Sequence, residues 1–214
     1  MPSSTPVRAV LFDWDGTLLD SYRADTQAYL KMFEALGIPW GLDELARHYS
    51  PDWYRVYRAA RLPRARWKQA SRLWRRFYRQ QKPVLLPGTW RVLRALERRF
   101  TLALVSSGSR SRVVGQLRQF GLAEMFRARV CSEDAHQRKP HPAPLELALR
   151  RLHLEPDVCV YVGDAPEDIE MARRAGVLAV AVLGPWASRQ RLRAARPQAV
   201  LRSIIELPAF LGRF

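Results

Sequence analysis

Short runs of apolar residues alternate along the chain with segments in which apolar positions recur every three or four residues. The runs predict buried strands at residues 8–13, 102–105, 129–131, 158–162, 177–183 and 199–201. The amphipathic segments predict helices at residues 89–99, 113–120, 144–152, 167–175 and 203–211, the last interrupted at Pro208. Strands that alternate with helices of roughly ten residues require parallel crossovers. The pattern therefore predicts an α/β protein, built as a three-layer sandwich around a central parallel sheet.

One long segment departs from this alternation. Between residues 19 and 84 the periodicity is helical throughout, with a helix at residues 21–37 and further helices from residue 42 to residue 81. Both ends of the segment adjoin strand–loop elements of the predicted sandwich, so we interpret it as a helical cap inserted after the first strand. The predicted domains are a catalytic core of residues 1–18 and 85–214 and an all-helical cap of residues 19–84.

The predicted cap holds much of the positive charge of the chain. The formal net charge of the protein is +16, and between Gly41 and Lys82 twelve Lys and Arg residues stand against three acids, a net charge of +9. This balance favours anionic partners, which include phosphorylated metabolites, nucleic acid and membrane surfaces. We expect most of the cap arginines to be solvated and one or two to reach the anionic end of a substrate. The expected buried face consists of Trp67, Ala70, Trp74, Phe77 and Tyr78.

Hydropathy and cysteine content bear on location. No apolar run approaches the roughly 18 residues that a membrane helix needs, and residues 1–8 are few and mostly polar. We therefore expect neither a membrane span nor a signal peptide, and a cytoplasmic protein. Cys131 and Cys159 lack the spacing of metal ligands and are expected to be reduced, buried thiols.

Polar residues gather directly after the predicted strands. Ligands of open α/β sheets bind at the carboxyl ends of the strands, so these positions are the candidates for chemistry. Four groups stand there: Asp13-Trp14-Asp15-Gly16-Thr17, Ser106-Ser107-Gly108, Lys139-Pro140, and Gly163-Asp164 with Asp168.

The carboxylates of the first and fourth groups form a concentrated negative site, and a hard divalent cation would relieve their repulsion. A small number of oxygen ligands suits Mg²⁺, which keeps several waters and shares a substrate phosphate. The Ser106 hydroxyl and the amides of Ser107 and Gly108 can bind phosphate oxygens, and Lys139 adds positive charge. Together the four groups predict a phosphoryl-transfer site.

In order and spacing, the four groups resemble the four motifs of the haloacid dehalogenase superfamily. The first resembles Asp-x-Asp-Gly-Thr, the second a Ser or Thr after an apolar strand, the third Lys-Pro, and the fourth Gly-Asp-x-x-x-Asp. Further similarity to the phosphoglycolate phosphatase-like branch lies at residues 18–21, 87–88 and 171–176. The resemblance runs from the first strand to Asp168 and implies a Rossmann-like core with an inserted cap.

The resemblance also implies a catalytic pair. Asp13 would be the nucleophile that forms an aspartyl-phosphate, and Asp15 the general acid and base. Mg²⁺ would be held by Asp13, the backbone carbonyl of Asp15 and Asp164, with Asp168 in support. The family's dehalogenases lack the second aspartate and its phosphatases have it, so Asp15 indicates phosphate ester chemistry.

Three further residues receive roles from the resemblance. Ser106 would bind the transferring phosphoryl group, Lys139 would offset the charge between nucleophile and phosphate, and Thr17 would hold the loop. The adjacent Ser107 remains an alternative to Ser106, because strand register decides which hydroxyl faces the site. Asp168 could instead be a first-turn helix acid that interacts with the helix dipole.

Two positions depart from the family pattern. Trp14 is bulkier than the aliphatic or Phe residue usual between the two aspartates, and Gly108 follows Ser107 where the family often has Asn and a further polar residue. Neither departure removes a required group.

Several functions share these motifs. The leading prediction is a magnesium-dependent phosphatase for a small phosphorylated metabolite, with phosphoglycolate as the first candidate. A phosphosugar mutase uses the same nucleophile and general acid, and a pyrophosphatase or nucleotidase is a third possibility. A nucleic-acid-binding module, with cap aromatics stacked on bases, is less favoured because those aromatics have the spacing of a buried helix face.

Overall fold

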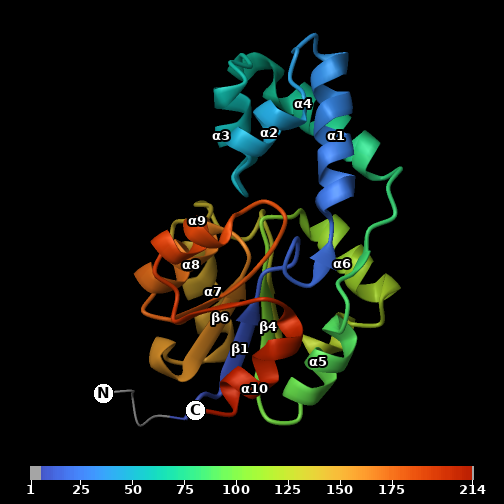
Figure 1. The fold of residues 1–214 in the computed structure, drawn as a ribbon. Coiled ribbons are helices and arrows are strands. Elements are labelled where there is room, and N and C mark those ends of the chain that lie inside the picture. Colours follow the sequence, from blue (N-terminus) through green and yellow to red (C-terminus); the bar gives the residue numbers. More distant parts are fainter. Residues whose placement is uncertain (1–5, 214) are drawn as a thin grey trace. The chain divides into compact units, whose positions relative to one another are not determined.

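The computed structural model describes residues 6–213 (Figure 1). Its contacts divide the chain into two compact units, one formed by residues up to Leu19 and from Leu85 onward, the other by Asp20–Val84. Residues 1–5 and 214 of the predicted core lie outside the described residues. Each unit is built on its own set of buried apolar side chains.

A six-stranded parallel sheet forms the centre of the larger unit, with strand order β5-β4-β1-β6-β7-β8. From β1 the chain proceeds outward to β4 and β5, then crosses to β6 and proceeds outward on the other side. The direction of winding therefore reverses between β1 and β6, the place where open α/β sheets bind ligands. The strands are β1 Ala9–Phe12, β4 Thr101–Val105, β5 Ala128–Val130, β6 Cys159–Gly163, β7 Leu178–Val182 and β8 Ala199–Leu201.

Helices cover both faces of this sheet, as buried parallel sheets require. Successive residues of β1 point to opposite faces: Val10 and Phe12 pack on one side, Ala9 and Leu11 on the other. The first face is covered by α5 Thr89–Leu96, α6 Arg110–Gln119 and α10 Leu207–Leu211. The second face is covered by α7 Ala143–Leu152, α8 Pro166–Arg174 and α9 Arg189–Ala194. The predicted three-layer α/β sandwich is confirmed.

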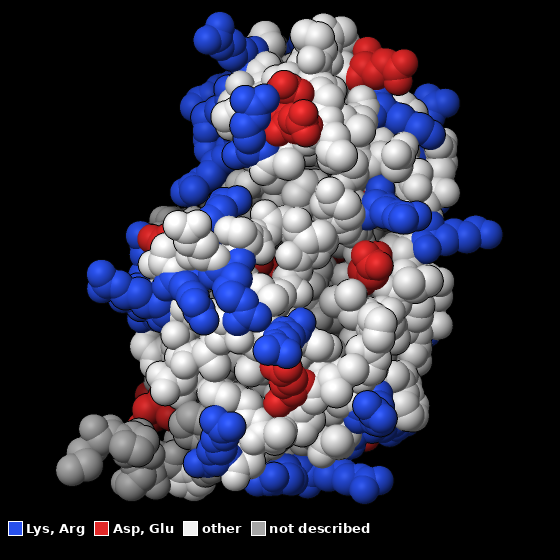
Figure 2. Space-filling model, viewed as in Figure 1, with Lys and Arg blue, Asp and Glu red and all other residues white. Residues whose placement is uncertain are grey.

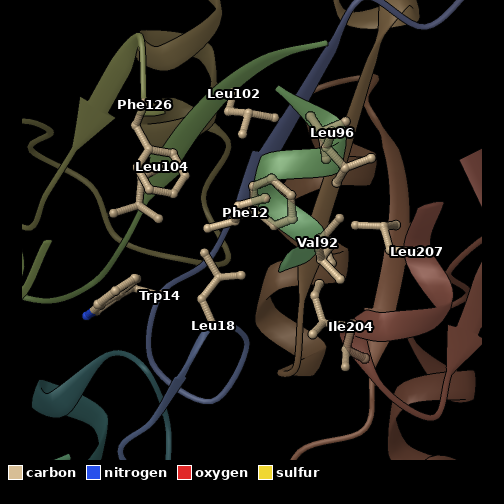
Figure 3. Close-up of a cluster of buried hydrophobic side chains, with 14 of the residues drawn as sticks. Phe12, Trp14, Leu18, Val92, Leu96, Leu102, Leu104, Phe126, Ile204 and Leu207 are labelled. Carbon is tan, nitrogen blue, oxygen red and sulfur yellow. The ribbon is translucent and has the colours of Figure 1, made fainter. Parts of the chain in front are cut away.

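Figure 3 shows the cluster on the first face. Phe12, at the end of β1, lies among apolar side chains from the neighbouring strand β4 and from α5. Trp14 and Leu18, from the loop after β1, belong to the same cluster and are fully buried. The loop that carries the first pair of aspartates is therefore fixed by the core on both sides of Asp15.

The smaller unit contains only helices apart from its ends. They are α1 Tyr22–Ala35, α2 Leu42–His48, α3 Trp53–Ala59, the 3₁₀ helix η1 Arg64–Arg66 and α4 Trp67–Tyr78. Short strands β2 Leu19–Asp20 and β3 Val84–Leu85 pair at the two points where the chain passes between the units. The sequence did not indicate this pairing, because two residues carry no periodicity.

The helices between residues 42 and 81 are more broken than the periodicity predicted. Pro51 stands between α2 and α3, and the Asp52 side chain accepts a hydrogen bond from the Tyr54 amide and caps α3. Pro63 precedes η1. A proline lacks an amide hydrogen, so each break falls beside a residue that cannot continue a helix.

The aromatic side chains of this unit pack largely on one another. Tyr54 stacks on Trp67 with ring centres 4.8 Å apart, and Trp74 stacks on Tyr78 at 4.7 Å. Of the expected buried face, Ala70 and Tyr78 are buried, while Trp67, Trp74 and Phe77 are half-buried. Nine of the ten arginines between Gly41 and Lys82 are exposed.

Two other boundaries of the larger unit differ from the prediction. The closing helix is divided into the 3₁₀ helix η4 Ile204–Glu206 and α10, with Pro208 in the first turn of α10, where no amide hydrogen bond is lost. Helix α6 begins at Arg110, three residues before the predicted start. Two more 3₁₀ helices, η2 Ala123–Met125 and η3 Pro156–Val158, connect α6 to β5 and α7 to β6.

The charged side chains at the surface are mainly basic. Lys and Arg are spread widely over the face in Figure 2, and acidic side chains are few there. Among residues 6–213, no helix is both long enough and apolar enough to cross a membrane.

Candidate active site

The register of the sheet places Asp13 and Asp164 at adjacent strand ends. Phe12 is paired with Val162 of β6, and the Asp13 amide donates to the Val162 carbonyl at 2.9 Å. Asp164 follows β6 by one residue. Both carboxylates therefore lie where the winding of the sheet reverses.

Asp13, Asp164 and Asp168 form a buried acidic group, in which one carboxylate oxygen of each lies within 4.8 Å of the others. Burial raises the pKa of Asp13 from its usual 3.8 to about 7, against the opposing effect of Lys139. Burial and the charges of Asp13 and Asp168 raise the pKa of Asp164 well above its usual value. Two carboxylates with raised pKa values, crowded against a third, are a donor set that fits a hard cation.

The Asp164 side chain lies in a cradle made by two glycines and one hydroxyl. A Cβ at Gly16 would lie 2.2 Å from Asp164 Oδ2, and one at Gly184 would lie 2.5 Å from the same oxygen. The Thr17 hydroxyl donates to Asp164 Oδ1 at 3.1 Å. Thr17 thus joins the first motif to the fourth. The sequence analysis did not single out Gly184, although it follows the fifth predicted strand.

Lys139 is buried beneath this group and directs its ammonium hydrogens at three acceptors. Its Nζ lies 2.6 Å from Asp13 Oδ1, 2.7 Å from Asp168 Oδ1 and 2.8 Å from the Tyr161 hydroxyl. Burial alone would lower the pKa of Lys139, but the two carboxylates outweigh it and hold that pKa above its usual value. Lys139 is therefore a fixed positive charge between two aspartates.

Asp168 contacts both the start of α8 and the buried centre of the site. Its Oδ2 accepts from the Ala165 amide at 3.1 Å, which satisfies the first turn of α8, and its Oδ1 contacts Lys139 and Tyr161. A Cβ at Gly163 would overlap the Asp168 side chain at 2.5 Å. The fourth motif therefore has a glycine where α8 approaches the end of β6.

Tyr161 is a site residue that the sequence did not reveal. Its hydroxyl accepts from Lys139, and its proton lies within reach of the Val105 carbonyl and Asp168 Oδ1, both at 3.1 Å. Burial, followed by the negative charges of Asp168 and Asp13, raises the pKa of Tyr161 well above its usual value. In the sequence it was one more apolar position of a predicted strand.

The second motif forms a tight turn after β4. The Gly108 amide donates to Ser106 Oγ at 2.9 Å. One of the two amides expected to bind phosphate, that of Gly108, is thus bonded within the motif, whereas the Ser106 hydroxyl still carries a proton that it can donate. Ser106 is buried and Ser107 half-buried. Both line one small cavity of about 10 Å³ beside Lys139, so this geometry leaves either serine as a candidate.

The Asp15 side chain pairs with Arg112 of α6. Arg112 Nη2 lies 2.6 Å from Asp15 Oδ2, and Arg112 Nη1 lies 2.7 Å from Asp15 Oδ1. The sequence analysis missed Arg112 because the predicted helix began one residue later. In the described residues, the Asp15 side chain is not part of the acidic group.

Comparison with known proteins identifies the class. Residues 10–182 match the family model described as haloacid dehalogenase-like hydrolase, and the chain belongs to this family. A phosphoglycolate phosphatase of Cupriavidus necator is 31% identical over 97% of this chain and 94% of its own length. Pyrophosphatase PpaX of Bacillus pumilus is 26% identical over 98% of this chain and 99% of its own.

A solved structure has the same fold. A hydrolase from Pseudomonas syringae superposes with a TM-score of 0.86 at 23% identity, covering 97% of this chain and 99% of that one. The predicted membership of the haloacid dehalogenase superfamily, in its phosphoglycolate phosphatase-like branch, is confirmed, and so is the prediction that the protein is an enzyme of the phosphatase class.

Proposed function

We propose that the protein is a magnesium-dependent phosphatase that hydrolyses a small phosphorylated metabolite through a phosphorylated Asp13. The observation that carries the proposal is the arrangement around Asp13. One of its oxygens contacts the fixed charge of Lys139 at 2.6 Å, and it shares a buried acidic group with Asp164 and Asp168. A carboxylate held between a cation and a metal-binding set is a nucleophile prepared to approach an anionic ester.

Two displacements at phosphorus make up the reaction. In the first, an Asp13 oxygen attacks the phosphorus, the ester bond breaks, and the leaving oxygen takes a proton from Asp15. In the second, a water molecule gives its proton to Asp15 as its oxygen attacks the same phosphorus, and the bond to Asp13 breaks to release inorganic phosphate. Asp15 begins and ends the cycle in the same protonation state.

Other residues of the chain have the remaining roles in the reaction. Asp13, Asp164 and the Asp15 backbone carbonyl would hold Mg²⁺, which supplies positive charge that offsets the charge of the phosphate. The Ser106 hydroxyl would donate to a phosphate oxygen. Asp168 supports the site through Lys139, with which it forms an ion pair at 2.7 Å.

For substrate selection we propose the helical unit of residues 19–84 as a cap. Its exposed arginines are suited to an anionic metabolite. Its aromatics stack on one another, which argues against a surface for stacking nucleic-acid bases. Phosphoglycolate is the first candidate substrate, because the Cupriavidus necator relative is named for it, and pyrophosphate is the second, because the Bacillus relative is named for that.

A panel of phosphate compounds tests the proposal. We expect release of inorganic phosphate from phosphoglycolate, pyrophosphate, nucleotides or sugar phosphates with Mg²⁺ present, and loss of that release with a chelator. Asp13→Asn should abolish turnover while leaving the melting temperature close to that of the wild type. Asp157→Asn is the matched control, because Asp157 is an exposed aspartate of the same unit.

Three results would contradict the proposal: turnover by Asp13→Asn, turnover in chelator, or no activity on any compound of the panel. Conversion of one sugar phosphate isomer into another without release of phosphate would identify a mutase instead.

A further inference from the structure

Arg112 and Asp15 form a two-point ion pair inside the larger unit. The two terminal guanidinium nitrogens, Nη2 and Nη1, each donate to one carboxylate oxygen, at 2.6 and 2.7 Å. The two side chains are only 15% and 17% exposed, so little solvent competes for the contact. A planar fork that holds both oxygens fixes the rotation of a carboxylate as well as its position.

The fold makes room for this guanidinium at Gly108. A Cβ at Gly108 would lie 2.2 Å from Arg112 Nη2 and 2.7 Å from Val113 Cγ2. A side chain at this position would therefore require the Arg112 guanidinium, which contacts Asp15, to shift. Gly108 is one of the two departures from the family pattern, and its lack of a side chain leaves the space that the Arg112 guanidinium occupies.

A second contact from α6 fixes the residue beside Asp15. Trp14 Nε1 donates to Gln116 Oε1 at 2.9 Å, and Arg112 Nη1 lies 3.3 Å from the same oxygen. Arg112 and Gln116 are four residues apart and so project from one face of the helix. Trp14, the other departure from the family pattern, is fully buried and supplies the indole nitrogen that this contact needs.

We propose that Arg112 is the positioning residue of the general acid and base. Together with Gln116 it locks the Asp13-Trp14-Asp15 loop to α6 and holds the Asp15 carboxylate in the orientation from which it exchanges protons with the leaving oxygen and with water. The proposal rests on the proposed function, because it assigns Arg112 an action only through Asp15.

The test is a double-mutant cycle read by rapid mixing. Alkyl leaving groups need a proton as they depart and nitrophenolate does not, so a general acid affects the burst of released alcohol more than the burst of nitrophenol. We expect Arg112→Gln to slow the alkyl burst by about 10- to 100-fold, the cost of a misplaced catalytic group. The nitrophenol burst and the KM for both esters should stay within about twofold of the wild type.

The cycle separates positioning from substrate binding. If Arg112 acts through Asp15, then Arg112→Gln combined with Asp15→Asn should give the same alkyl burst as Asp15→Asn alone. Methylguanidinium should restore part of the alkyl burst of Arg112→Ala, whereas methylammonium should restore less. Arg118→Gln is the control, because Arg118 is an exposed arginine of the same helix.

Several outcomes would overturn the inference. They are a wild-type or faster alkyl burst in Arg112→Gln, a raised KM for both esters, or a further loss when Arg112→Gln is added to Asp15→Asn. If Arg112→Gln does not fold, Arg112→Lys keeps the charge without the fork and must show the same selective loss. A normal alkyl burst in Asp15→Asn would instead refute the acid–base role in the proposed function, so the two failures are distinguishable.

Discussion

At the scale of single residues, the contacts of Lys139 hold its charge in place. Its three ammonium hydrogens face Asp13, Asp168 and Tyr161. Lys139 thus lets two aspartates lie close together. Its expected part in binding phosphate and in offsetting the charge between the nucleophile and phosphate stays a prediction.

Among the three partners of Lys139, Tyr161 is the uncharged one, so its hydroxyl can be removed without changing the charge of the site. We expect Tyr161→Phe to lower kcat about tenfold with little change in KM, because Lys139 loses one acceptor and shifts relative to Asp13. Steady-state kinetics on the best substrate of the panel, together with thermal unfolding, measure both effects.

The matched control for this change is Tyr57→Phe in the helical unit. Tyr57 is also buried and its hydroxyl lies 3.3 Å from Ser71 Oγ. Tyr57→Phe should cost stability and leave kcat unaltered. An unchanged kcat in Tyr161→Phe, or equal losses of kcat in both variants, would show that the Tyr161 hydroxyl does not act on the site.

At the scale of elements, two glycines beside or inside helices differ in backbone conformation and in what an added Cβ would meet. Gly88 precedes α5 with φ +82°, a conformation that side chains disfavour, and a Cβ there would lie 2.6 Å from Ile205 Cγ1. Gly115 lies inside α6, and a Cβ there would meet no atom of the described residues within 4 Å apart from its chain neighbours and the backbone of its own helix. The same substitution should therefore have opposite effects at the two positions.

We expect Gly88→Ala to lower the free energy of unfolding by roughly 1–3 kcal/mol, because the left-handed backbone becomes strained. Gly115→Ala should raise it by about 0.5–1 kcal/mol, because alanine loses less backbone entropy in a helix. Thermal or urea unfolding of both variants beside the wild type gives the comparison. If both substitutions change the free energy of unfolding in the same direction, backbone conformation at the two glycines does not determine their effect on stability.

At the scale of the whole molecule, the acidic group links stability to pH and to metal. In the metal-free protein the pKa of Asp13 is about 7 instead of 3.8, chiefly because it is buried. The folded state then holds this proton more tightly than the unfolded chain. The stability that results is fully present below pH 3.8 and is lost as the pH rises through about 7.

Mg²⁺ should reverse this loss, because it binds the ionised carboxylates and must compete with protons. We expect Mg²⁺ to raise the melting temperature clearly at pH 8 and only slightly at pH 5. The reference is NaCl at equal ionic strength, since a protein of net charge +16 also responds to salt alone. Asp13→Asn should lose most of the shift at pH 8. An equal shift at both pH values would contradict a site built on these carboxylates.

The sequence by itself determined the alternation of strands and helices and the four strand-end motifs. Buried strands of a parallel sheet need apolar residues on both faces, so they appear as short apolar runs, and polar residues can follow only where a strand ends. The position of Asp13 and of Asp164 follows directly from that rule. Such signals can be recognised in a single sequence because each depends only on residues that are neighbours along the chain.

Only the tertiary structure decided which side chains meet. Tyr161 contacts Lys139 because β6 lies beside β1, and Arg112 contacts Asp15 across 97 positions of the chain because α6 packs on the face of the sheet below that loop. Nothing in the residues around Tyr161 or Arg112 marks these contacts. Side-chain chemistry at a site depends on distances across the fold, and those distances are set by packing between elements, which local periodicity does not encode.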